Sequence, residues 1–230
     1  IGQHAVSRTQ LVDLNGDNRP DAIIVPESKE ATRPVVYLQA DPGDSGTAPV
    51  FKRIADTGLP PMTSADILTF SDLDNDGHAD AVIGRYLDIY QDDYKPPADS
   101  PTRTGWLKGR GDGTFGETQA ITEAPLATTR SMAVGDVNMD GLPDLFMGNW
   151  YERYFTGYEG FANDLLLQVE GQKEGLEFVR WPMPNETLST TYIEDLGGRP
   201  TYGVALPRLD SGLPMLLELN YGRRWNRLYQ

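Results

Sequence analysis

One acidic motif of nine residues recurs three times along the chain, and it constrains the fold more than any other feature. The copies span Asp13–Asp21, Asp72–Asp80 and Asp136–Asp144, and a degenerate fourth copy spans Pro207–Met215. A motif that recurs at intervals of tens of residues indicates a fold built from equivalent units stacked on their neighbours. We therefore expect four structural repeats.

Short apolar runs flank each copy of the motif. Runs such as 22–25, 81–83 and 145–147 are rich in β-branched or large apolar residues, which is typical of buried strands. Further candidate strands precede each motif and follow each second strand, and the predicted fourth strands lie around Phe51, Phe115 and Phe178. Four antiparallel strands in each unit make the blade of a β-propeller.

The predicted fold class is therefore all-β, a β-propeller of four-stranded antiparallel blades. We expect a single and partial propeller domain over residues 1–230. The approximate blades are 5–56, 64–124, 128–190 and 200–230, and the last blade is incomplete. Because a propeller closes its ring to avoid exposed sheet edges, we expect further blades or a partner chain to complete it. A small four-bladed ring is the alternative.

The side chains of the three intact loops favour calcium. Ca²⁺ takes six to eight oxygen ligands, which a short loop supplies from alternate side chains and one backbone carbonyl. We expect about three Ca²⁺ ions, while Mg²⁺ fits less well because it usually retains its waters. The predicted ligands at positions one, three, five, seven and nine are Asp13, Asn15, Asp17, Arg19 and Asp21; Asp72, Asp74, Asp76, His78 and Asp80; and Asp136, Asn138, Asp140, Leu142 and Asp144.

Position seven is expected to contribute only its carbonyl oxygen, since its side chains have no common chemistry. Position six is Asn18, Gly77 or Gly141, which are residue types that tolerate positive φ. An EF-hand would need a bidentate Glu at position twelve and flanking helices, but these loops have apolar residues there. Ordinary solvated turns remain the other alternative, although they would not require an acid at position nine.

Composition excludes several functions. Lys and Arg number 20 against 34 Asp and Glu, so the net charge is −14, which argues against nucleic-acid binding. No apolar run reaches the length of a membrane span, so no membrane insertion is expected. The chain has no Cys and no hydrolase or phosphate-binding motif, so we expect it not to be an enzyme.

Aromatic residues gather in the predicted loop 149–161, between the second and third strands of the third unit. Trp150, Tyr151, Tyr154, Phe155 and Tyr158 are candidate ligand-binding residues, because aromatic rings at a rim can grip a glycan or a protein. Packing against the neighbouring blade is the alternative. In an up-and-down blade this loop lies on the rim opposite the acidic loops.

These loops, together with the turn Gly111-Asp112-Gly113-Thr114-Phe115, resemble the FG-GAP and VCBS repeats of integrin α-chain propellers and exported bacterial proteins. Asn226-Arg227-Leu228-Tyr229 is also similar to the UnbV/ASPIC group, which includes cartilage acidic protein. The resemblance implies calcium in the loops between first and second strands, an extracellular, periplasmic or cell-surface location, and a non-catalytic binding, adhesion or assembly role. The fourth loop departs from the pattern, because Pro207, Leu209, Ser211 and Met215 cannot supply the expected ligands.

Two other functions stay open at this point. One is a carbohydrate-active enzyme of the polysaccharide lyase type that uses the face opposite calcium, where Asp92 and Asp93 lie. The other is a structural subunit of an extracellular assembly.

Overall fold

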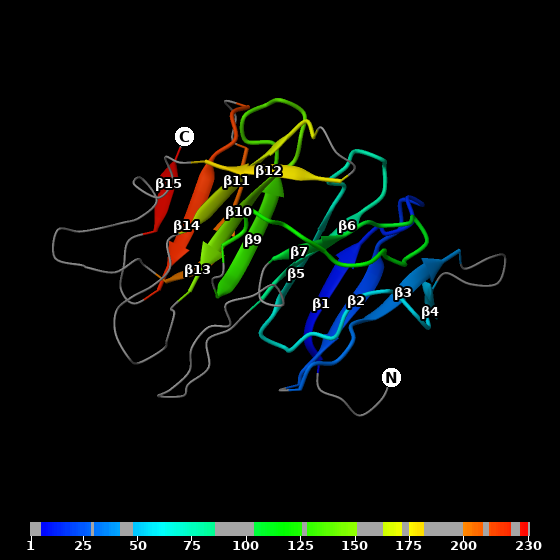
Figure 1. The fold of residues 1–230 in the computed structure, drawn as a ribbon. Helices are drawn as coiled ribbons and strands as arrows, with labels where there is room; N and C mark the ends of the chain where they lie inside the picture. The colour runs from blue at the N-terminus through cyan, green and yellow to red at the C-terminus, as the bar shows by residue number, and fades with distance from the viewer. Residues whose placement is uncertain are drawn as a thin grey trace. The chain divides into compact units, whose positions relative to one another are not determined.

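The protein is all-β in the part of the chain that the structure describes. The computed structural model describes residues 6–28, 30–41, 48–85, 104–125, 128–150, 163–171, 175–181, 200–208, 212–221 and 226–229. These residues form fifteen strands in four antiparallel sheets and no helix (Figure 1). Accordingly, they provide no helix that could span a membrane. The predicted fold class is confirmed.

Strand order follows chain order in every sheet, as in an up-and-down propeller blade. The first sheet contains β1 (Val6–Val12), β2 (Asp21–Pro26), β3 (Val35–Ala40) and β4 (Val50–Arg53). The second contains β5 (Ile67–Ser71), β6 (Asp80–Gly84), β7 (Gly105–Leu107) and β8 (Gln119–Ala120). The third contains β9 (Thr129–Gly135), β10 (Asp144–Asn149), β11 (Asp164–Val169) and β12 (Glu177–Arg180). The fourth contains β13 (Thr201–Ala205), β14 (Leu216–Asn220) and β15 (Arg227–Tyr229).

The chain forms two compact units. One comprises residues 1–66, 70–82 and 106–119, and the other comprises 67–69, 83–105 and 120–230. In the first unit, β2 alternates between buried and partly exposed residues, so that Ile23 and Val25 face the core while their neighbours do not. The rings of Phe70 and Phe115 also lie in this unit, with their centroids 5.8 Å apart.

In the second unit, the core lies between the third and fourth sheets. Phe146, Leu165 and Leu216 form its buried cluster. Every residue of β10 is buried, because this strand is internal to its sheet and covered on both faces. The strand also passes close to β13, since a Cβ added at Gly148 would lie only 2.8 Å from Val204 Cγ1. Only Gly leaves room for this approach.

A buried polar network joins the same two sheets. The side-chain amide of Asn163 donates to Thr201 Oγ1 at 2.8 Å and to Glu218 Oε1 at 2.6 Å. Burial raises the pKa of Glu218, although hydrogen bonds from Asn163 and Tyr229 oppose this shift. The network gives these polar side chains the hydrogen bonds that burial requires.

In the second sheet, the position predicted for one strand is wrong. Its fourth strand is β8, Gln119–Ala120, and does not lie around Phe115. Phe115 instead forms an isolated bridge with Gly109 and donates its amide to Thr57 O at 2.8 Å. The ladder is interrupted because Gly111 and Gly113 adopt positive φ in the intervening turn. The turn that contains Gly111 and Gly113 is closed by a hydrogen bond from Arg110 N to Thr114 O at 3.0 Å.

Candidate metal centres in the acidic loops

The three intact loops share one backbone conformation. Each joins the first and second strands of its sheet, as predicted. Position six has positive φ in every loop, at 60° in Asn18, 87° in Gly77 and 90° in Gly141, which confirms the expectation for this position. Position four also has positive φ, and sequence reasoning missed it. It is occupied by Gly16, Asn75 and Met139.

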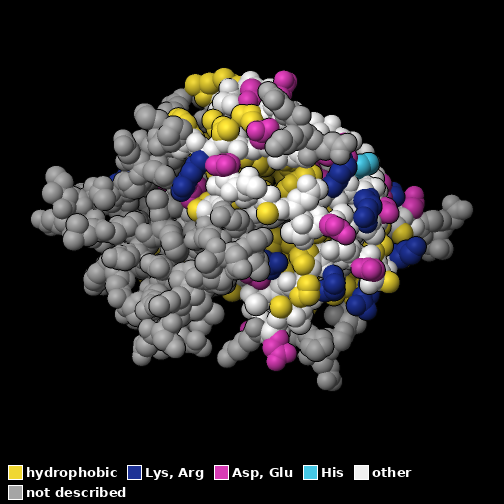
Figure 2. All heavy atoms as spheres, in the orientation of Figure 1, with side chains coloured by type: hydrophobic (Ala, Val, Ile, Leu, Met, Phe, Trp, Pro, Cys, Tyr) yellow, Lys and Arg dark blue, Asp and Glu magenta, His cyan; other side chains and the backbone are white. Residues whose placement is uncertain are grey.

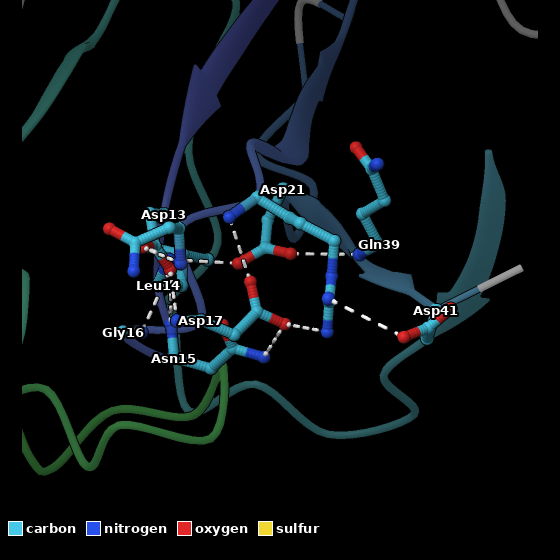
Figure 3. A network of polar contacts seen from close by, with 10 residues as sticks. Asp13, Leu14, Asn15, Gly16, Asp17, Asp21, Gln39 and Asp41 are labelled. Atoms are coloured by element: carbon cyan, nitrogen blue, oxygen red, sulfur yellow. Dashed lines mark hydrogen bonds and ion pairs between the residues drawn. The ribbon is translucent and has the colours of Figure 1, made fainter.

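The first acid of each loop accepts hydrogen bonds from the backbone that curls around it. Asp13 Oδ1 accepts from Gly16 N at 2.8 Å, and its Oδ2 accepts from Asn18 N at 2.8 Å (Figure 3). Asp72 and Asp136 likewise accept from the residues four and five positions further on, at 2.9 to 3.1 Å. The positive φ angles turn these amides inward, so the first acid sets the curvature of the loop.

The third and fifth side chains continue the same pattern. Position three accepts from the amide of position five, and position five accepts from the amide of position seven. The latter distances are 2.9 Å from Arg19 N to Asp17 Oδ1, from His78 N to Asp76 Oδ1 and from Leu142 N to Asp140 Oδ1. Each of these side-chain oxygens is therefore fixed by its own loop.

The ninth acid connects the loop to the third strand. Asp21 Oδ2 accepts from Leu14 N and its Oδ1 accepts from Gln39 N, both at 2.8 Å (Figure 3). The corresponding bonds of Asp80 come from Leu73 N at 2.9 Å and Gly109 N at 2.7 Å. Those of Asp144 come from Val137 N at 2.8 Å and Gln168 N at 2.9 Å. Sequence reasoning predicted an acid here but not this connection.

Burial distinguishes the ninth acid from the others. Asp21, Asp80 and Asp144 have no exposed surface, whereas Asp76 and Asp140 are exposed. Burial raises the pKa of each of the three buried acids, and the two amide donors act against that shift. Neighbouring loop carboxylates raise it further. A cation bound beside these acids would relieve both destabilising effects.

The donor set of the second loop fits a divalent cation. Asp72, Asp74 and Asp80 each place one carboxylate oxygen within 4.8 Å of the other two. Oxygens on a common Ca²⁺, at about 2.3–2.6 Å from the ion, must lie within about 5 Å of one another. The hydrogen bonds already accepted do not prevent ligation, because each carboxylate oxygen has two lone pairs. In the other two loops, Asn15 and Asn138 take the place of Asp74.

Basic side chains contact two of the loops. Arg19 Nη2 lies 2.8 Å from Asp17 Oδ2 (Figure 3). Partial desolvation acts to raise the pKa of Asp17, but hydrogen bonds from Asn15 and Arg19 outweigh this effect and lower the pKa. Lys108 pairs with Asp74 and Asp76 in the second loop, and its hydrogen bond lowers the pKa of Asp76. On the face shown in Figure 2, the described acidic and basic side chains are interspersed.

The fourth loop is built differently. Met215 N donates to Pro207 O at 3.0 Å, and Arg208 forms an isolated bridge with Pro214. Among the residues of this loop that the structure describes, 207–208 and 212–215, these backbone contacts close the loop. Leu209 and Ser211 lie outside the described residues.

Of the predicted aromatic residues, only Trp150 is described, because Tyr151, Tyr154, Phe155 and Tyr158 lie outside the described residues. Trp150 is 6% exposed, and its ring packs against two tyrosines. The centroid distances are 5.2 Å to Tyr202 and 5.1 Å to Tyr221. Burial of Trp150 favours the packing interpretation for this residue.

The two tyrosines were missed from the sequence, because they lie far from Trp150 in the chain. Tyr202 is 51% exposed and Tyr221 is 37% exposed, and Arg130 Cζ lies 5.4 Å from the Tyr202 ring centroid. We call Trp150, Tyr202, Tyr221 and Arg130 the aromatic cluster. The strand registers place it at the opposite end of the third and fourth sheets from their loops between first and second strands.

The sheets and their acidic loops define a propeller-type repeat protein. A family profile described as FG-GAP-like repeat matches residues 13–83 and 98–147, which is more than half of the chain. The chain therefore belongs to the FG-GAP-like repeat family. Such repeats typically occur in extracellular or surface proteins. A comparison with curated proteins finds no match.

Proposed function

We propose that this chain is a calcium-stabilised, extracytoplasmic binding module without catalytic activity. The observation that carries the proposal is the shared hydrogen-bond frame of the three loops, which holds acidic or amide oxygens at the same positions. The three carboxylates gathered in the second loop are its strongest instance. The family assignment supports a propeller module of the binding or adhesion type.

Calcium would be held by the side chains of positions one, three, five and nine, together with the carbonyl of position seven. When bound, it supplies positive charge to carboxylates that otherwise repel one another. Position nine has a double role in this arrangement. It orients the loop and connects it to the third strand. A loop that holds calcium would therefore stabilise the centre of its sheet as well as the end where the loop lies.

The expected energies favour a location outside the cytosol. Extracellular calcium modules have a Kd of about 10⁻⁴–10⁻³ M, so a 10⁻⁴ M site in millimolar calcium adds roughly 1.4 kcal/mol of stability. Three such sites add about 4 kcal/mol, a sizeable fraction of typical domain stability. At submicromolar calcium the same sites would be empty and their contribution lost.

Calcium removal provides the test. In EDTA, we expect the melting temperature to fall by about 8–16 °C relative to 2 mM CaCl₂, because about 4 kcal/mol corresponds to such a shift at this chain length. Differential scanning calorimetry measures the change, with 2 mM MgCl₂ as the control cation. Equal melting temperatures in EDTA and calcium would contradict the stabilising role, and equal effects of Mg²⁺ and Ca²⁺ would contradict the choice of ion.

The aromatic cluster is the candidate surface for a partner. Tyr202 and Tyr221 are partly exposed, tyrosine rings can pack on sugar rings, and the guanidinium of Arg130 adds a hydrogen-bond donor beside them. We therefore propose that the partner is a glycan. The alternative is a protein partner that binds the same surface.

A glycan array probed with the intact protein tests this assignment. Tyr202→Ala should abolish the signal of any glycan that binds here, whereas Leu213→Ala, a substitution of another exposed apolar residue, should leave it unchanged. Binding that persists in Tyr202→Ala would contradict the assignment. Cleavage of a bound glycan would contradict the non-catalytic role and would favour the polysaccharide lyase alternative.

A further inference from the structure

The first and third loops share an internal hydrogen bond between positions three and five. Asn15 Nδ2 donates to Asp17 Oδ2 at 3.0 Å, and Asn138 Nδ2 donates to Asp140 Oδ2 at 2.8 Å. In both loops, a neutral amide at position three thus neighbours a carboxylate at position five. This bond draws the two side chains together without any repulsion between charges.

The second loop has no amide at this place. Its third residue is Asp74, and an ionised carboxylate has no hydrogen to donate to Asp76. The ammonium group of Lys108 instead contacts both side chains. It pairs with Asp74 Oδ2 and lies 2.8 Å from Asp76 Oδ2. The same two positions are therefore bridged in all three loops, but by a different donor in the second.

We propose that Lys108 is a positioning residue of the second loop, a tethered cation that replaces the missing position-three amide. Its place in the chain suits this role. Lys108 directly follows β7, and the next residue, Gly109, donates its amide to Asp80 at 2.7 Å. Two consecutive residues of the third-strand segment thus hold the third, fifth and ninth acids of the loop.

The charges of the loops agree with this role. The second loop contains four acids, whereas the first and third contain three each. Lys108 places its positive charge beside the additional acid, in contact with both Asp74 and Asp76. Without it, Asp74 and Asp76 would repel each other until a divalent cation neutralised them. The part of this inference that concerns calcium rests on the proposed function.

The test is a double-mutant cycle with Lys108→Met and Asp74→Asn, measured first in EDTA. We expect Lys108→Met to lower the melting temperature by about 1–3 °C, the shift that the loss of a partly exposed ion pair gives at this chain length. Asp74→Asn should restore most of that loss, because it supplies the amide found in the other loops. Lys52→Met, at an exposed lysine of β4, is the matched control and should have little effect.

Calcium then gives a second readout. Adding calcium should raise the melting temperature of Lys108→Met more than that of the unmodified protein, since calcium replaces the missing cation. The inference is overturned if Lys108→Met melts like Lys52→Met in EDTA, or if Lys108→Met costs the same in the Asp74→Asn background. If calcium has no effect on the unmodified protein, the proposed function fails, while the cycle in EDTA still decides the role of Lys108.

Discussion

At the scale of single residues, the fourth position of each loop shows how strictly the acidic motif fixes the backbone. All three residues there have positive φ, yet only the first loop uses Gly. Met139 adopts a φ of 62°, although its side chain is 58% exposed and gains little from packing. The inward-turned amides that follow it require this conformation. Met139 therefore stores local strain that the hydrogen bonds of Asp136 offset.

Replacing Met139 with Gly should stabilise the protein. The left-handed conformation costs a non-Gly residue about 1–2 kcal/mol, and the added freedom of Gly in the unfolded chain takes back about 0.5–1 kcal/mol. We expect a net gain of about 0.5–1 kcal/mol, measured by urea denaturation. Met139→Ala is the matched control, because it removes the long side chain but keeps the Cβ. A gain of the same size in Met139→Ala would show that the backbone is not the cause.

At the scale of strands and loops, the ninth acid connects each acidic loop to the third strand of its sheet. Its carboxylate accepts one amide from the loop and one from the third-strand segment. In the third sheet, Asp144 accepts from Val137 at the start of the loop and from Gln168 in β11. A single side chain thus fixes the loop and the end of the sheet together.

Asp144→Ala should be among the most destabilising single changes in the loops. It leaves two amide groups without an acceptor, and each unsatisfied buried group costs about 1–3 kcal/mol. We expect a loss of about 2–4 kcal/mol by urea denaturation in EDTA, so that calcium does not contribute. Asp144→Asn keeps one acceptor oxygen and should cost less. Glu117→Ala, at an exposed residue, should change stability by less than about 0.5 kcal/mol. An Asp144→Ala variant as stable as Glu117→Ala would refute the structural role of the ninth acid.

At the scale of the whole molecule, most of the fold could be predicted from the repeated motif. The loop period and the flanking apolar runs located most of the strands, because alternating burial and turn chemistry are local properties of the sequence. The missed features depend on contacts between distant segments. Phe115 lies outside the fourth strand and donates its amide to Thr57 in a distant segment, and the pairing of Lys108 with Asp74 depends on the return of the third strand. The tyrosines beside Trp150 come from another sheet altogether.

The connection from each ninth acid to the third strand also turns three backbone amides into natural probes. The N–H groups of Gln39, Gly109 and Gln168 each donate to one such carboxylate, so their exchange with deuterated solvent depends on how long that acceptor stays in place. A loop that opens would be reported by the hydrogen of a residue many positions away in the chain. The opening of each of the three loops could therefore be followed separately in one spectrum of the native protein.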